Sequence, residues 1–178
     1  MKDVMFDLET WGTAPGSALR SVGAVFFNPT TGELGKEFYA NISDESCEAA
    51  GLTKDENTVK WWSRQSQAAQ DALLVDPKPL ETVIDEFKAF FKENGGREVW
   101  AQGSNFDPVL WEAALGRFEN RRTPWFFWDT RDTRTVYRIA QFNPKWITRE
   151  GTYHNALDDA KHQVACVAAA LGRIKAAA

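Results

Sequence analysis

The stretch Asp3-Val4-Met5-Phe6-Asp7-Leu8-Glu9 decides the fold, because its side chains alternate with a period of two. One face of a strand built this way is apolar and carries Val4, Phe6 and Leu8. The other face carries the two acids, Asp7 and Glu9. A first strand this rich in apolar residues is more often central in a sheet than exposed. The sequence therefore predicts a central strand that presents a pair of carboxylates.

Outside this strand, the hydrophobic pattern predicts an α/β order of elements. Two strands flank a turn cluster at 28–32 and form a hairpin. Along the chain, the pattern gives three strands, two helices, a strand, a helix, a strand and two helices, with irregular loops at 49–56 and 142–151. The predicted strands span 3–9, 21–27, 36–42, 99–101 and 124–128. The predicted helices span 58–74, 80–91, 107–115, 131–140 and 155–174.

Length and composition favour one ordinary globular domain over residues 1–178. Hydrophobic residues make up 43% and charged residues 26%, which excludes disordered and collagen-like classes. The 21 basic and 25 acidic residues give a net charge of −4, so no global basic field attracts nucleic acid. Any contact with a polyanion must therefore be local.

The expected location is the cytoplasm. The longest apolar stretch, 164–171, is far shorter than the roughly 18 residues of a membrane span. The N-terminus lacks the basic flank and apolar run of a secretory signal. Cys47 and Cys166 form no CxxC or zinc pattern and are interpreted as reduced, structural thiols.

The acidic pair on the first strand is a candidate metal site. Asp7 and Glu9 project from the same face about 7 Å apart along the backbone and can share a divalent ion. The alternative is a solvated edge strand.

Four further residues are candidates, each with an ordinary structural alternative. Asp107 precedes a proline and fits a helix cap, which is compatible with metal ligation. Asp159 lies one turn into a helix beside Asp158, where a lone aspartate is usually a solvated surface residue. His154 can be a loop or cap histidine, and His162 a surface histidine.

Taken in order along the chain, these residues form a recognisable set. Asp7-Leu8-Glu9-Thr10, Asn105-Phe106-Asp107 and the segment from His154 to Asp159 resemble the three exonuclease motifs of the DEDDh group, a branch of the DnaQ-like 3′-5′ exonucleases. Each motif alone is unspecific, whereas the ordered triple is specific. Trp61-Trp62, Gln65 and the segment 131–135 are similar to a compact ribonuclease T-like subgroup of bacteria and phages.

The resemblance implies a ribonuclease H-like fold, in which helices flank a mixed five-stranded sheet. It also implies a metal-dependent 3′-5′ exonuclease that releases nucleoside 5′-monophosphates from single-stranded 3′ ends, of RNA in preference to DNA, and a homodimer. The implied metal ligands for two Mg²⁺ or Mn²⁺ ions are Asp7, Glu9, Asp107 and Asp159, and the implied general base is His154. The implied substrate-binding residues are Thr10, Trp11, Asn105, Trp62 and Gln65. Many relatives have glycine where this chain has Trp11, which changes the expected base pocket.

The acidic set agrees with the chemistry of phosphodiester hydrolysis. Hard oxygen ligands suit Mg²⁺ or Mn²⁺, and two such ions activate water and neutralise phosphoryl charge. Basic residues guide the strand or simply form a solvated helix face; they are Arg131, Arg134, Arg138, Lys145 and Arg149. The competing function is a catalytically silent nucleic-acid binding or scaffold protein on the same fold.

Overall fold

Five strands form one mixed sheet with β1 at its centre. The computed structural model describes residues 1–177, and its strand order is β3-β2-β1-β4-β5. β2 runs antiparallel to β1, and β4 runs parallel to it. The strands are β1 (Asp3–Thr10), β2 (Leu19–Phe27), β3 (Leu34–Asn41), β4 (Glu98–Ala101) and β5 (Thr130–Asp132). The predicted α/β fold with a mixed five-stranded sheet is confirmed.

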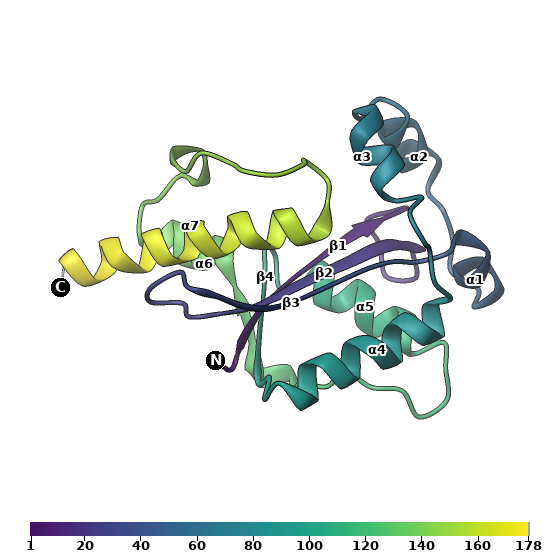
Figure 1. The fold of residues 1–178 in the computed structure, drawn as a ribbon, viewed down its shortest axis with the longest axis horizontal. Coiled ribbons are helices and arrows are strands. Elements are labelled where there is room, and N and C mark those ends of the chain that lie inside the picture. Colours follow the sequence, from purple (N-terminus) through teal and green to yellow (C-terminus); the bar gives the residue numbers. More distant parts are fainter. Residues whose placement is uncertain (178) are drawn as a thin grey trace.

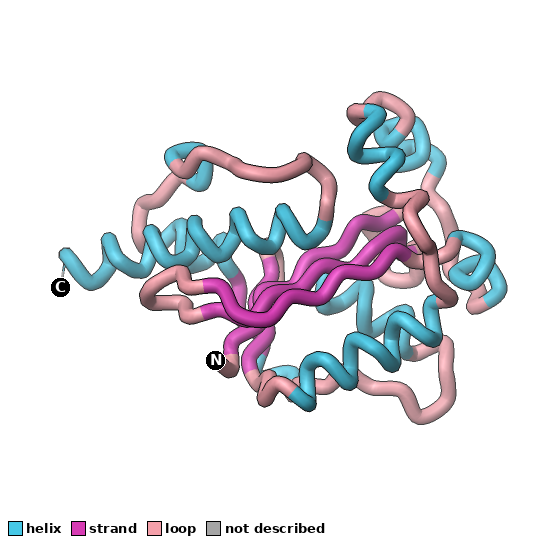
Figure 2. Tube along the Cα trace, viewed as in Figure 1, coloured by secondary structure: helices cyan, strands magenta, loops and turns pink. Residues whose placement is uncertain are grey.

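Helices cover both faces of this sheet. The helices are α1 (Asp44–Ala49), α2 (Glu56–Trp62), α3 (Gln67–Ala72), α4 (Leu80–Glu93), α5 (Asp107–Leu115), α6 (Thr133–Ile139) and α7 (Ala156–Ala177). In Figure 1, α6 and α7 lie on one side of the sheet and α4 and α5 on the other, while α2 and α3 stand beyond the C-terminal end of β1. The same layers are visible in Figure 2 as cyan helices around magenta strands. No helix of the described residues is long and apolar enough to cross a membrane.

The alternation of β1 divides the core into two clusters. Even-numbered residues such as Phe6 pack against α4 and α5, where its ring centroid lies 5.3 Å from that of Phe87 and 5.6 Å from that of Trp111. Met5 belongs to the other cluster, with Val164 and Val167 of α7. The odd-numbered face of β1 is therefore the face that α7 covers.

Two features make room for side chains and for α7 at the C-terminal end of β1. Pairing with β4 runs only from Asp3 opposite Glu98 to Met5 opposite Trp100, so the two strands part before Asp7. On the other side, Gly23 of β2 pairs with Asp7, and a Cβ at Gly23 would lie 2.2 Å from backbone atoms at the start of α7. The missing side chain lets the first turn of α7 lie directly on the sheet beside Asp7.

The single helix predicted over 58–74 is wrong. The chain instead forms α2 and α3, because the Ser66 side chain accepts a hydrogen bond from the backbone N–H of Ala69 and starts a new helix. α1 was not predicted at all, although Ser43 caps it in the same way by accepting from the N–H of Ser46.

The strand predicted over 124–128 is also wrong, since β5 begins at Thr130, opposite Val99. In this aromatic run, Trp125 packs in the core beside Phe6 and Phe91. Phe126, Phe127 and Trp128 are exposed by 63%, 84% and 57%.

Candidate active site

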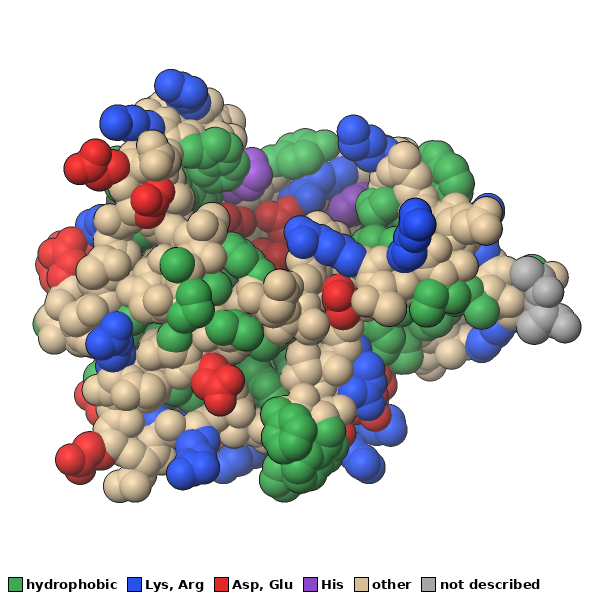
Figure 3. Space-filling model, turned by 180° about the vertical axis from the view of Figure 1, so that it is seen from behind, with side chains coloured by type: hydrophobic (Ala, Val, Ile, Leu, Met, Phe, Trp, Pro, Cys, Tyr) green, Lys and Arg blue, Asp and Glu red, His purple; other side chains and the backbone are tan. Residues whose placement is uncertain are grey.

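Four acidic side chains and one histidine line a single hollow at the C-terminal end of β1. Asp7 and Glu9 come from β1, Asp107 is the first residue of α5, and Asp159 lies in the first turn of α7. With His154, from the loop before α7, they line a hollow of about 530 Å³. Figure 3 shows red carboxylates within this hollow, with purple histidines and blue basic side chains around it. The structure thus brings together all five predicted catalytic residues.

Burial makes the charged forms of Asp7, Glu9 and Asp107 unfavourable. The pKa of Asp7 is raised well above its usual range, first by burial and then by the charges of Asp107, Glu9 and Asp159. Burial, followed by the charge of Asp159, likewise raises the pKa of Glu9. For Asp107, burial raises the pKa to about 7. The hollow therefore favours either bound protons or added positive charge.

Two hydrogen bonds fix the orientation of these acids. The Asp107 Oδ1 accepts from the backbone N–H of Leu8 at 3.2 Å, in the stretch where β1 has left β4. Gln163 Nε2 donates to Asp7 Oδ1 at 2.7 Å. Gln163 is not among the residues predicted from the sequence. It lies four residues after Asp159 and hence on the same helix face, which is the signal that would have identified it.

His154 lies against an aromatic wall next to two of the acids. Its ring centroid is 4.8 Å from that of Trp61 and 5.8 Å from that of Trp62. Donor atoms of Glu9, His154 and Asp159 all lie within 4.8 Å of one another. Burial lowers the pKa of His154, which favours the neutral ring that accepts a proton.

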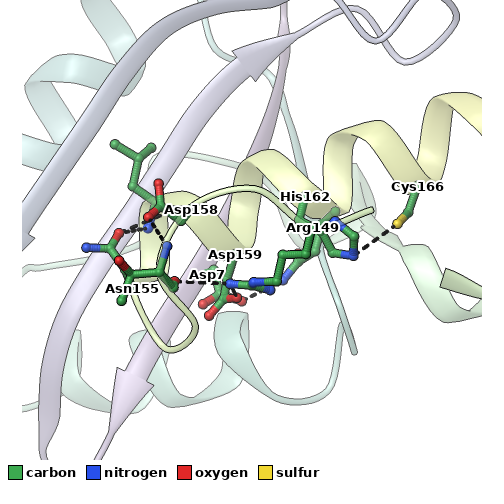
Figure 4. A network of polar contacts seen from close by, with 10 residues as sticks. Asp7, Arg149, Asn155, Asp158, Asp159, His162 and Cys166 are labelled. Carbon is green, nitrogen blue, oxygen red and sulfur yellow. Dashed lines mark hydrogen bonds and ion pairs between the residues drawn. The ribbon is translucent and has the colours of Figure 1, made fainter. Parts of the chain in front are cut away.

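The loop that carries His154 is held by the start of α7. Asp158 Oδ2 accepts from the backbone N–H of Thr152 at 2.8 Å. Asn155 Oδ1 caps the helix by accepting from the N–H groups of Leu157 and Asp158 (Figure 4). Gly151 has a φ of 81° and leaves no room for a Cβ beside Asp158. Asp158 therefore anchors the loop while its neighbour Asp159 faces the hollow.

His162 also lines the hollow but has a different partner. Its Nε2 lies 3.5 Å from the Sγ of Cys166 on the next turn of α7 (Figure 4). Burial, followed by the charge of Arg149, lowers the pKa of His162.

Two of the five predicted strand-guiding basic residues line the hollow, Arg134 and Arg149. Arg149 Nη2 forms an ion pair with Asp159 Oδ1 (Figure 4). Arg131 is instead paired with Glu98 at 3.1 Å, on the strand next to β5.

The donor set fits a divalent cation. Carboxylate oxygens are the ligands that Mg²⁺ and Mn²⁺ prefer, and oxygens of Glu9 and Asp159 lie close enough to share an ion. The raised pKa values of Asp7 and Glu9 point in the same direction, since a cation relieves the repulsion among these acids.

A second hollow of about 630 Å³ adjoins the first. The two share Leu8, Glu9, Trp61 and Phe106 in their linings. Polar side chains from the start of α2 and the loop before it complete the second hollow; they include Thr13, Asp55, Asn57 and Thr58. Trp61 stands at the boundary with 44% of its surface exposed.

The predicted substrate-binding residues divide into two groups. Thr10 and Trp62 line the second hollow, where the buried Trp62 indole N–H donates to the Thr10 carbonyl at 2.9 Å. The other three line neither of the two hollows, within residues 1–177. The Trp11 indole N–H donates to Asp44 at 2.6 Å, Gln65 donates to the Trp61 carbonyl at 3.0 Å, and Asn105 is exposed.

The fold is similar to those of solved exonucleases. The nuclease domain of 3′hExo, a DEDDh family member bound to rAMP, matches with a TM-score of 0.63 and 13% identity, over 96% of this chain and 91% of that chain. A 3′-exonuclease that recognises the 3′ end of histone mRNA stem-loop matches with a TM-score of 0.59 and 17% identity, over 96% and 81%. The zinc-bound E. coli ExoI–ssDNA complex matches with a TM-score of 0.56 and 12% identity, over 98% and 40%.

At these identities, the structural matches show the shared fold. A search of curated proteins finds no match. The family model described as the 3′-5′ exoribonuclease Rv2179c-like domain matches residues 2–171, which is nearly the whole chain. Together with the DEDDh motifs in one hollow, this match shows that the chain belongs to the Rv2179c-like family of 3′-5′ exoribonuclease domains and is a 3′-5′ exonuclease.

Proposed function

We propose that this exonuclease is metal-dependent and hydrolyses single-stranded 3′ ends, of RNA in preference to DNA, to nucleoside 5′-monophosphates. The observation that carries the proposal is the meeting of four acids and His154 in one hollow, from three separate elements and a loop. The family description supports an RNA substrate, and the similar folds solved with rAMP and with ssDNA support a nucleic-acid strand. The cytoplasm remains the proposed location.

The roles follow from position. Asp7, Glu9, Asp107 and Asp159 would hold two divalent ions, which when bound neutralise phosphoryl charge, help ionise water and support the leaving oxygen. His154 then accepts a proton from the attacking water, since its ring lies beside Glu9 and Asp159 and its pKa is lowered by burial.

The second hollow is the proposed place for the terminal nucleoside. It shares Glu9 and Trp61 with the acidic hollow, so a nucleoside there would place its phosphate near the acids. Trp61 presents an exposed aromatic surface at this boundary, and stacking on such a surface tolerates every base.

The competing function is nucleic-acid binding without hydrolysis. Binding alone gains nothing from four clustered carboxylates, because in their charged forms they repel phosphate, and burying Asp7 and Glu9 costs free energy that binding does not need. The acidic hollow therefore favours hydrolysis over silent binding.

The test uses 3′-labelled single-stranded RNA and DNA with Mg²⁺, Mn²⁺ or a chelator. We expect stepwise release of mononucleotides that the chelator stops. Asp7→Asn should abolish hydrolysis and weaken Mn²⁺ binding in calorimetry, since Asp7 lies at the centre of the acidic set. Asp71→Asn, on the exposed side of α3, is the matched control. Unchanged Mn²⁺ binding in Asp7→Asn, or hydrolysis that survives the chelator, would refute the metal mechanism.

A further inference from the structure

Arg149 supplies positive charge at one of the acids assigned to the metal. Its Nη2 pairs with Asp159 Oδ1, and only 13% of the Arg149 side chain is exposed. Asp159 is also one of the three residues whose donor atoms lie within 4.8 Å of one another. The guanidinium therefore binds the carboxylate of a residue that belongs to the candidate cation site.

A guanidinium and a divalent cation compete for this carboxylate. Both are positive, and at contact distance within a partly buried hollow they repel each other. Release of Asp159 by Arg149 would remove this repulsion and so favour loading of the site.

Arg149 has other anchors that keep it at the hollow after such a release. Nη2 also donates to the carbonyl of Thr152 at 3.3 Å, and the guanidinium carbon lies 4.3 Å from the ring centroid of Tyr153. These contacts come from the same loop as Arg149 and do not depend on Asp159. The side chain would therefore swing rather than leave.

Arg149 also has unused donor capacity. Its Nε is buried and has no hydrogen-bond partner within the described residues. A guanidinium is built to donate two parallel hydrogen bonds to one phosphate. The strand proposed to enter this hollow carries such phosphates.

We propose that Arg149 changes partners during the catalytic cycle. It pairs with Asp159 in the cation-free protein, and when the acids take up divalent cations it releases Asp159 and donates to a phosphate oxygen of the strand. This inference rests on the proposed metal-dependent function. It makes Arg149 both a competitor of the metal and a substrate-contacting residue.

The first test is Mn²⁺ calorimetry without nucleic acid. Arg149→Gln removes the competing charge, so Mn²⁺ should bind about tenfold more tightly, the size expected for one lost charge-assisted contact. Arg149→Lys keeps a charge but not the fork and should stay close to wild type. Arg122→Gln, an exposed arginine next to Arg121, which pairs with α4, is the control and should change nothing.

The second test is steady-state kinetics on single-stranded RNA at saturating Mn²⁺. Arg149→Gln should raise KM about tenfold with a smaller change in kcat, and the salt dependence of binding should lose one phosphate contact, about 0.7 in slope. A purely structural arginine would instead lower Tm and weaken Mn²⁺ binding.

The outcomes separate the two proposals. Mn²⁺ binding by Arg149→Gln that equals or falls below that of wild type overturns the inference alone. An unchanged KM in this variant also overturns it. If the wild-type protein takes up no Mn²⁺, the proposed metal dependence fails and the inference falls with it.

Discussion

At the scale of single residues, His154 and His162 differ in what surrounds them. Both line the acidic hollow, but of the two only His154 has a ring nitrogen within 4.8 Å of carboxylate oxygens of Glu9 and Asp159. We expect His154→Ala to lose about 10² to 10⁴ in kcat, the usual contribution of a general base. His162→Ala should lose much less, and kcat at saturating Mn²⁺ measures both. A larger loss in His162→Ala would contradict the assignment.

The pH profile tests the same histidine independently. A general base must be neutral, so activity is present above its pKa and is lost as pH falls through it. Burial lowers the pKa of His154 below its ordinary value of 6.5. With Mn²⁺ kept saturating at every pH, the acid limb of kcat should therefore lie below 6.5 and disappear in His154→Ala. An acid limb above this value would assign it to another group.

Two tryptophans near the hollows are expected to behave differently. Trp61 is exposed by 44% where the hollows meet, so Trp61→Ala should raise KM for short oligonucleotides, at roughly 1 to 3 kcal/mol per stacked base, with little change in Tm. Trp11 is packed under the Arg20 guanidinium, 3.8 Å from its ring centroid, so Trp11→Ala should mainly lower Tm. The predicted base-stacking role of Trp11 requires that Trp11→Ala also lose affinity for oligonucleotides. Oligonucleotide affinity and thermal melts of the two variants distinguish stacking from packing.

Some site residues were predictable because the regular spacing of side chains along a strand or helix fixes which way they point. Asp7 and Glu9 fall on one face by strand alternation alone. Trp61 and Trp62 had to point in different directions on a helix, but only packing against Thr10 shows that Trp62 is the buried one. The ion pair of Arg149 with Asp159 depends on how the 16-residue connection 140–155, which includes a short 3-10 helix at Pro144–Trp146, folds back over α7. No periodic pattern in the sequence predicts that path.

At the scale of elements, the contact of α7 with β2 positions Asp159. Gly23→Ala would place a methyl group 2.2 Å from the backbone of Ala156, so the first turn of α7 must move away from Asp7. We expect a lower Tm and a large loss of kcat. Gly172→Ala, on the same helix with nothing within 4 Å of its added Cβ, should instead be neutral or stabilising by up to about 1 kcal/mol. Thermal melts and kcat of the pair provide the measurement, and wild-type activity in Gly23→Ala would contradict this view of α7.

The elements that were mispredicted are those set by partners distant in sequence. The aromatic run at 124–128 has strong strand propensity, yet the position of β5 is fixed by pairing with β4, from Val99 opposite Thr130 onward. The break between α2 and α3 did have a local signal in the cap residue Ser66.

At the scale of the whole molecule, removal of the metal should make folding stability depend on pH through the buried acids of the hollow. The pKa of Asp107 is raised from an ordinary 3.8 to about 7, so its proton favours the folded state below 3.8, and this stabilisation is lost as pH rises through about 7. With a chelator, Tm should therefore fall between about pH 4 and 7 by this contribution and level off above it. Mn²⁺ should remove much of that fall, because it binds only the folded site. Thermal melts over pH with and without Mn²⁺ test this, and a fall of equal size with Mn²⁺ would contradict it.

Two predictions for the whole chain remain predictions, the homodimer and the single domain over residues 1–178. The exposed side chains of Phe126, Phe127 and Trp128 form an apolar cluster in which Phe126 and Trp128 stack with ring centroids 4.7 Å apart. A fully buried aromatic side chain covers about 150 to 250 Å². Because these three are exposed by only 63%, 84% and 57%, two facing copies of the cluster would bury about 600 to 1,000 Å² in all, which is less than the roughly 1,200 Å² total of a stable interface. A dimer would need further surface.

The alternation of β1 limits how this protein can tolerate changes in chain length. Phe6 faces the aromatic core, while Asp7 on the opposite face lines the acidic hollow and accepts a hydrogen bond from Gln163. Deletion or insertion of one residue between Met5 and Glu9 would turn every later side chain of the strand to the opposite layer. Carboxylates would then enter the aromatic core, and apolar side chains would enter the hollow. A substitution in β1 can alter folding or catalysis separately. A one-residue shift in the register of β1 would abolish both at once.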